Sequence, residues 1–311
     1  MLRRVRFAIA ALAIAIAIGG CGLGGGPGTS KVTMTLTRGF GSRQVALLNE
    51  DRVPAGQTVL GMLERKFPSI GLGRASPTGR TLQSINGVAG DTPLAGWFFW
   101  VNGVKTSKGP GLTSLHPGDR VWWDLHDPSA TTVIRAVVGS FPEPFQRGIN
   151  GQRLPTTLEC GAGLTTACNL VERDLDRAGV PVASQYIGTG SGPDTLGVVV
   201  GTWPEISAQL DAGLIEHGPS ASGVYARFGA GGRTLQLLNP KGQVARTLGA
   251  GAGLVAATAD SQSVPTWLIT GTDPAGVIAA ARALNAGTLH DHFALAVQGS
   301  TDVPVPVEPL R

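Results

Sequence analysis

Alternating apolar and polar side chains near the start of the chain predict a small sheet with one helix. Residues 32–37 alternate apolar positions with threonines, as in a half-buried strand. Four apolar residues then follow at helical spacing before Pro68: Val59, Met62, Leu63 and Phe67. Further strands are expected at residues 43–48, 81–86, 96–102 and 120–125. The order ββαβββ predicts a first domain over residues 31–127, with its helix against one face of the sheet.

Beyond a short hinge at residues 127–129, strand and helix patterns alternate and predict a larger second domain over residues 132–305. Strands are expected at 133–138, 154–160 and 293–297, and the nearly continuous apolar run 195–201 predicts a strand buried on both faces. Helices are expected at 164–178 and 275–286. The predicted fold class is therefore α+β, with the small domain followed by a larger mixed α/β domain.

Two segments of the second domain resemble each other. Residues 154–161 and 264–271 are identical at four of eight positions, and each precedes a predicted helix. A duplication would make two similar lobes with a cleft between them, which would be a natural ligand site. Chance similarity in a chain rich in proline and glycine is the alternative.

Aromatic residues dominate two strands of the first domain. Because side chains alternate across a strand, one face of this strand pair is wholly apolar. The other face carries Phe98, Trp100, Asn102, Arg120, Trp122 and Asp124. A small sheet needs only one apolar face, so something must cover the aromatics on the second. Two explanations stay open: the second domain covers them, or they form a ligand platform with polar anchors.

The same strands carry a family resemblance. Gly96-Trp-Phe-Phe-Trp-Val-Asn-Gly103 and Leu115-His-Pro-Gly-Asp-Arg-Val-Trp-Trp-Asp124, separated by a Gly-rich loop, resemble the DUF4430 family, which includes the C-terminal domain of transcobalamin and intrinsic factor. The resemblance implies a β-grasp-like fold for residues 31–127. By analogy it also implies cobalamin or a similar planar ligand on Phe98, Trp100 and Trp122, presented at the membrane to an uptake transporter.

The first twenty residues have the pattern of a secretory signal. A basic segment, residues 1–6, precedes twelve uncharged residues, 7–18, which are too few to cross about 30 Å of hydrocarbon as a helix. Ile18-Gly19-Gly20-Cys21 resembles the bacterial lipoprotein processing box, which implies a lipid on Cys21 and a Gly-rich tether over residues 21–30. The chain is then expected on the outer face of the plasma membrane. A cleaved signal with an incidental Cys21 is the alternative.

Composition and charge argue against two classes of protein, disordered chains and nucleic-acid-binding proteins. The 42% of hydrophobic residues excludes wholesale disorder. The sequence pI near 9.2 suggests polyanions, but cleavage before Cys21 would remove Arg3, Arg4 and Arg6 and no acidic residue. The remaining chain would hold 22 basic and 21 acidic residues, which leaves no electrostatic footprint for nucleic acid.

Cysteine and histidine suggest structure rather than catalysis. Cys160 and Cys168 are an even pair in an oxidising compartment, and we expect a disulfide between them, with two free thiols as the alternative. His290 and His292 flank Asp291 without a third metal ligand nearby, so no metal site is predicted. His116, His126 and His217 are isolated and are expected on the surface.

Catalytic motifs are not found. Residues 188–192 lack the serine position of a nucleophile elbow, and the glycines of 249–253 lie between strands rather than before a helix. Four carboxylates could meet in space to form a catalytic pair: Glu143, Glu159, Glu205 and Asp273. We therefore expect a non-catalytic, ligand-binding lipoprotein. One alternative is an interaction protein of the envelope that uses the aromatic face between its domains, and a third is an envelope hydrolase.

Overall fold

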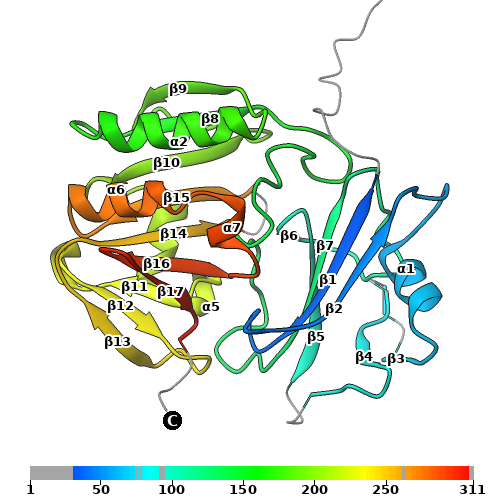
Figure 1. The fold of residues 1–311 in the computed structure, drawn as a ribbon. Helices are drawn as coiled ribbons and strands as arrows, with labels where there is room; N and C mark the ends of the chain where they lie inside the picture. The colour runs from blue at the N-terminus through cyan, green and yellow to red at the C-terminus, as the bar shows by residue number, and fades with distance from the viewer. Residues whose placement is uncertain (1–30, 75, 78, 91–94, 261–263, 308–311) are drawn as a thin grey trace, which may run out of the picture.

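The computed structural model describes residues 31–74, 76–77, 79–90, 95–260 and 264–307. The two largest sheets, one in each domain, stand side by side and are joined by the segment between β7 (Arg120–His126) and β8 (Thr156–Cys160) (Figure 1). This is the predicted α+β class, with a small sheet and helix followed by a larger mixed domain. The predicted signal peptide, lipidation site Cys21 and tether lie outside the described residues. Within the described part of the chain, no helix is both long and apolar enough to span a membrane.

The first domain has the β-grasp arrangement. Its elements are β1 (Val32–Arg38), β2 (Arg43–Glu50), α1 (Val59–Lys66), β3 (Ile70–Leu72), β4 (Leu82–Ile85), β5 (Gly96–Val101), β6 (Val104–Lys105) and β7. The main sheet has the order β2-β1-β7-β5-β6, in which β1 and β7 are parallel and the other pairs are antiparallel. β3 and β4 form a separate two-stranded sheet.

Local sequence explains the position of α1. The Thr58 hydroxyl accepts a hydrogen bond from the amide of Gly61 at 3.1 Å and caps the helix, and the chain becomes extended at Phe67, just before Pro68. Val59, Met62 and Leu63 are fully buried against the apolar face of the sheet. Burying each such side chain stabilises the fold by about 1.5–3 kcal/mol. The helix thus covers one face of the sheet and leaves the aromatic face to other elements.

The second domain is built on a seven-stranded sheet of order β17-β16-β14-β15-β10-β8-β9. β9, β8, β10 and β15 are parallel, and the strands beyond β15 are antiparallel. A three-stranded antiparallel sheet, β11-β12-β13, forms a further layer. The elements after β8 are α2 (Thr165–Arg177), β9 (Val182–Tyr186), β10 (Leu196–Thr202), α3 (Trp203–Ile206), α4 (Leu210–Gly213), η1 (Leu214–His217), α5 (Pro219–Ser222), β11 (Ala226–Phe228), η2 (Ala230–Gly232), β12 (Leu235–Leu238), β13 (Val244–Leu248), β14 (Ala252–Thr258), β15 (Thr266–Gly271), α6 (Pro274–Arg282), α7 (Ala286–Leu289), β16 (Ala294–Gln298) and β17 (Thr301–Val305).

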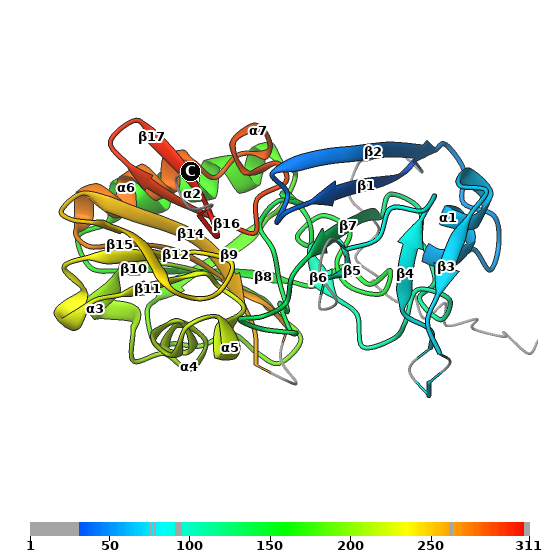
Figure 2. The same ribbon diagram turned by 90° about the horizontal axis from the view of Figure 1, so that it is seen from below.

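Alternation along the strands separates two apolar cores. Helices α2 and α6 cover one face of the large sheet, and the three-stranded sheet lies on the other with α3, α4 and α5 (Figure 2). Val198 and Val200 of β10 face the helices, whereas Val199 faces the opposite layer. The prediction of a strand buried on both faces is confirmed for β10.

Three sequence predictions need correction. Residues 133–138 form only an isolated bridge, between Val104 and Ala136. The segment lies between the two domains, and its apolar side chains pack alternately into the two cores instead of lining one strand of a sheet. The expected helix 275–286 ends at Arg282, and Asn285 caps the new short helix α7. The strand expected at 293–297 is not the last of the sheet, because β17 pairs with it as one more antiparallel strand.

The two similar segments do not form separate lobes. They contain β8 and β15, which are both parallel neighbours of β10 in one continuous sheet. The helices that follow them, α2 and α6, pack against each other on the same face. The two segments are therefore joined through β10 and through this helix pair, and no cleft separates them in the described part of the chain.

Candidate functional site

The aromatic face of the first domain is buried in the interface with the second. Trp100 and Trp122 are only 1% and 3% exposed. Phe293, just before β16, packs edge-on against both indoles, with ring centroids 5.2 Å from Trp100 and 4.9 Å from Trp122. The Trp100 indole nitrogen donates a hydrogen bond to the carbonyl of Ile134 at 2.8 Å. The face therefore joins the domains.

This burial corrects the prediction of a ligand platform on Phe98, Trp100 and Trp122. A planar ligand has no access to the two indoles, because residues beyond 132 already cover them. Burying so much aromatic surface is favourable, and the second domain supplies the apolar partner that the sheet alone lacks. Phe98 is the half-buried rim of this face, with the Lys105 ammonium 5.5 Å from its ring centroid.

His126 lies inside the interface, where the sequence predicts a surface histidine. Its imidazole is stacked between Phe40 and Phe98, at centroid distances of 4.4 and 4.5 Å, and the residue is 4% exposed. The position follows from strand alternation: His126 is two residues after Asp124 and four after Trp122, so all three share a face. The alternation was readable in the sequence, but the partner Phe40 comes from a distant turn.

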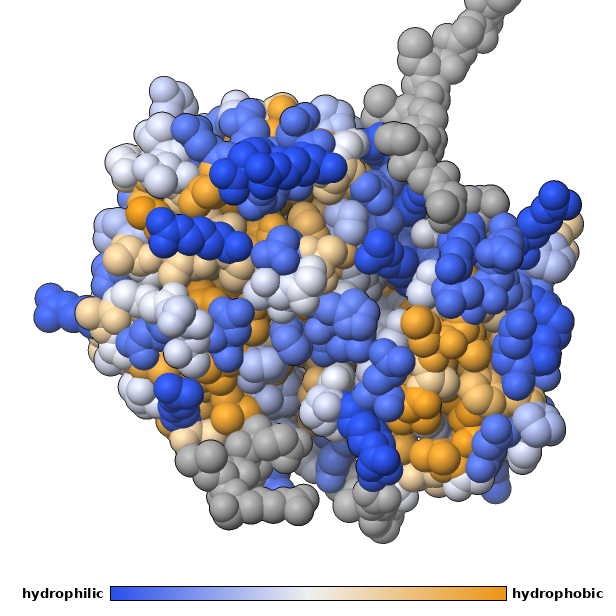
Figure 3. Space-filling view, in the orientation of Figure 1, coloured by the Kyte–Doolittle hydropathy of each residue, from blue (hydrophilic) through white to orange (hydrophobic). Residues whose placement is uncertain are grey.

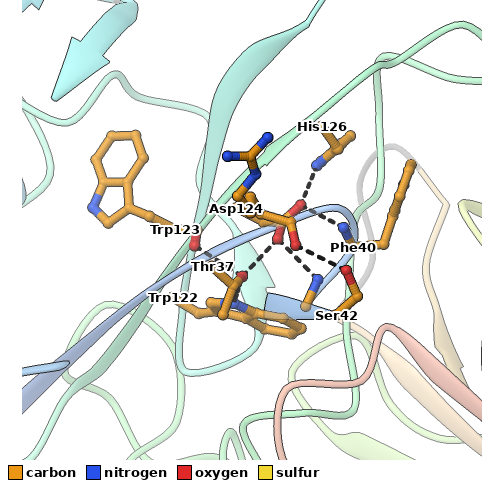
Figure 4. A network of polar contacts seen from close by, with 9 residues as sticks. Thr37, Phe40, Ser42, Trp122, Trp123, Asp124 and His126 are labelled. Atoms are coloured by element: carbon orange, nitrogen blue, oxygen red, sulfur yellow. Dashed lines mark hydrogen bonds and ion pairs between the residues drawn. The ribbon is translucent and has the colours of Figure 1, made fainter. Parts of the chain in front are cut away.

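Asp124 is the centre of a buried polar network (Figure 4). One carboxylate oxygen accepts from the backbone amide of Phe40 at 3.0 Å and lies 2.8 Å from Nδ1 of His126. The other accepts from the Thr37 hydroxyl at 2.6 Å and from the Gly41 amide at 2.9 Å. The Trp122 indole in turn donates to the Thr37 hydroxyl at 2.8 Å. The carboxylate thus has four close partners within the described part of the protein.

The turn between β1 and β2 is shaped to supply these amides. Phe40 and Gly41 both have positive φ, 57° and 81°, which points successive backbone amides at the carboxylate. A Cβ at Gly41 would lie 1.8 Å from the carbonyl oxygen of Asp291 in the second domain, so only glycine fits there. The turn therefore binds Asp124 and contacts the second domain at the same point.

Asn102 and Arg120, the other predicted anchors, also hold the domains together. The Asn102 amide, fully buried, donates to Asp119 at 2.8 Å and to the carbonyl of Gly148 at 3.1 Å. The Arg120 guanidinium donates to the carbonyl of Phe141 at 3.0 Å. All six predicted site residues thus lie at or beside the interface, and the polar groups of Asn102, Arg120 and Asp124 bond within the protein.

Glu143 is a buried carboxyl group in the segment between the domains. It is 1% exposed and accepts a hydrogen bond from the amide of Arg147 at 2.7 Å. Burial raises its pKa to about 7, against the opposing effects of that amide and the nearby charges of Arg120 and Arg147. Glu143 therefore changes charge near neutral pH at a junction between the two domains.

The remaining carboxylates offered for catalysis each have a local structural partner. Glu205 accepts from the amide and hydroxyl of Thr202 and caps α3, and Asp273 accepts from the amides of Gly251 and Gly276 and caps α6. Glu159 accepts from the amide of Gly188 at 2.9 Å. Helix capping and loop anchoring account for these contacts.

The predicted disulfide is present, and the two histidines beside Asp291 have a local partner. Cys160 and Cys168 form a disulfide, with Cα atoms 6.0 Å apart, which links the end of β8 to the first turn of α2. His290 Nδ1 lies 3.2 Å from a carboxylate oxygen of Asp291. In the described ranges, no group of three or more His, Cys, Asp or Glu residues is placed to hold a metal ion.

The fold and interface define a β-grasp-like domain fixed through its aromatic face to a mixed α/β domain. Residues 56–127 match a family described as "Domain of unknown function (DUF4430)", and the match ends just beyond β7 without reaching the second domain. A crystal structure described as that of "a putative metal binding protein" from Ruminococcus gnavus ATCC 29149 is 15% identical, with 31% of this chain and 96% of that chain covered. Its TM-score of 0.27 is too low to establish a shared fold. No curated protein sequence matches this chain.

Proposed function

We propose that this chain is a lipid-anchored, extracytoplasmic interaction protein without catalytic activity, in which the DUF4430 domain and the α/β domain act as one unit. The observation that carries the proposal is the burial of Trp100 and Trp122 beneath Phe293. The face that the family analogy offers to a corrinoid is used to join the domains. The two domains then present one continuous surface from the outer face of the membrane.

Two further observations support this proposal. The N-terminal pattern ending in Cys21 resembles that of a processed lipoprotein, and a lipid there would hold the chain at the membrane. The four carboxylates that the sequence offers for a catalytic pair are engaged as helix caps, a loop anchor and an interface group. These four residues therefore give hydrolysis no support.

Two measurements test the proposal on the full chain. Membrane fractionation should find the chain with the membrane, and Cys21→Ala should release it and abolish incorporation of a labelled fatty acid. Titration with cobalamin, followed by tryptophan fluorescence with inner-filter correction, should give no saturable quenching. Saturable quenching that disappears in Trp122→Phe would restore the aromatic ligand site. Retention of Cys21→Ala in the membrane fraction, or its continued fatty-acid labelling, would contradict lipid anchoring through Cys21.

A further inference from the structure

A groove of about 450 Å³ lies on the second domain, and every residue that lines it belongs to that domain. Its floor follows from strand alternation: Glu159 of β8 is paired with Val199 of β10, and Thr266 of β15 is in the next row. The Gly-rich loop 188–195 and residues 208–211 form its walls. The volume is within the range of about 300–1,000 Å³ that is typical of small-molecule sites.

Three carboxylates line this groove. Glu159 is 3% exposed and accepts hydrogen bonds from the Gly188 amide at 2.9 Å and from the Gln209 side chain at 3.1 Å. Asp211 accepts from the Thr266 hydroxyl at 2.5 Å, and Asp260 is close enough to act on it electrostatically. Burial, and then the charge of Asp260, raise the pKa of Asp211.

Positive charge is missing from the same surface. Among the described residues that line the groove, none is a lysine, an arginine or a histidine. The amides around Glu159 hold the carboxylate in place but bring no net charge to offset it. Negative charges between low-dielectric walls concentrate a field that attracts cations. The groove is therefore electrostatically complementary to a positively charged ligand.

The rest of the lining is apolar and favours an organic ligand over a bare ion. Leu210 at the groove is 74% exposed, the second-largest exposure among the large hydrophobic residues of the described chain. Val199, Ala208 and Val264 add further apolar surface. The carboxylates of the groove are not among any described cluster able to hold a metal ion, which favours a ligand that spreads its contacts along the groove.

We propose that the groove binds a small organic cation, with its ammonium or guanidinium group at Asp211, Asp260 and Glu159 and its apolar body against Leu210. The charge of the groove selects the cation, and the exposed leucine supplies the apolar contact that a bound molecule would cover. The residues that line the groove do not include the aromatic residues of the interface or Cys21. The test of cation binding is therefore independent of the test of the proposed function.

Calorimetric titration of the full chain in detergent with phenethylamine tests the proposal, with 2-phenylethanol as a neutral probe of nearly the same shape. Phenethylamine should bind about tenfold more tightly than the alcohol, a difference of about 1.4 kcal/mol. Asp211→Asn and Glu159→Gln should each weaken phenethylamine binding about fivefold or more, and added salt should weaken it further. Glu172→Gln removes an exposed carboxylate on α2, outside the groove, and should leave binding unchanged.

Three results would overturn the proposal. The first is equal binding of the amine and the alcohol. The second is no binding of either at millimolar concentration. The third is equal weakening by Glu172→Gln and Asp211→Asn, which would indicate attraction to the overall charge of the chain. Far-UV circular dichroism of each variant shows whether it is folded, and Asp211→Asn carries the test if Glu159→Gln disturbs the Gly188 loop.

Discussion

The aromatic interface and the acidic groove place carboxylates in partly dehydrated surroundings, yet they satisfy them differently. At the interface, Asp124 has four close partners from the protein, and the aromatic surface around it is closed by Phe293. In the groove, Asp211 has one close hydroxyl donor and a neighbouring carboxylate, and Leu210 beside it is open to solvent. A complete donor set marks a structural junction, whereas an incomplete one marks a place where a molecule from solution can add stability.

The interface and the groove differ most in how their apolar side chains are packed. Phe293→Ala, at the interface, should therefore have the largest effect on the free energy of unfolding. Phe293 fills the space between Trp100, Trp122 and His126, so its removal leaves a cavity in the interface. We expect the free energy of unfolding to fall by about 4–5 kcal/mol. Urea unfolding followed by tryptophan fluorescence measures this loss. Phe293→Leu should lose much less, and a loss below about 1 kcal/mol for Phe293→Ala would mean that the domains do not depend on this contact.

Asp124→Asn tests whether the polar network at the interface is as fully paired as its geometry indicates. Replacing either carboxylate oxygen by an amide group leaves one backbone amide facing another donor: that of Phe40 on one side, or that of Gly41 on the other. The Thr37 hydroxyl keeps the carbonyl of Trp123, 3.2 Å away, as an acceptor. Because an unpaired buried donor costs up to about 3 kcal/mol, the free energy of unfolding should fall by about 3 kcal/mol. The same change at exposed Glu172 should have almost no effect, and equal losses at the two sites would contradict a special role for Asp124.

Glu143→Gln should change how stability depends on pH. Because the folded-state pKa of about 7 is above the ordinary value of 4.5, the folded protein keeps a proton that the unfolded chain releases. The protonated Glu143 therefore stabilises the folded state fully below about pH 4.5, and this contribution to the free energy of unfolding is lost as the pH rises through about 7. The variant should match the wild-type chain at low pH and be more stable above pH 8 by up to about 3 kcal/mol. Urea unfolding at several pH values measures the difference, and parallel curves for the two proteins would refute it.

Strand alternation predicts much of the first domain and the membership of its aromatic face. The sequence places Trp100, Trp122 and Asp124 on one side of the sheet, which the structure confirms. The sequence also indicates that another part of the protein must cover these aromatic side chains, because a small sheet needs only one apolar face. The residue that covers them could not be predicted, because Phe293 is 193 residues from Trp100 and 171 from Trp122 in the sequence. Its approach depends on the packing of two complete domains.

Two other features were hidden for similar reasons. His126 continues the alternation, but its burial depends on Phe40 in a turn whose positive φ is set by Gly39, Gly41 and the contact with Asp291. The acidic groove combines Glu159, Asp211 and Asp260, which are dispersed over about a third of the chain and show no motif. Sequence predicts side-chain faces within an element well, but it does not predict which distant elements meet.

The smallest expected change in stability comes from Leu210→Ala, the counterpart of Phe293→Ala in the groove. Leu210 is 74% exposed, so its truncation leaves no buried cavity, and the free energy of unfolding should change by less than about 0.5 kcal/mol. Binding should respond instead, because a ligand body would lose its apolar contact, and phenethylamine affinity should fall about threefold to tenfold. Leu47→Ala, at a leucine on β2 that is 50% exposed, is the matched control and should leave binding unchanged. If Leu210→Ala weakens folding and leaves the amine bound as before, Leu210 belongs to the packed structure and the contrast between the two regions fails.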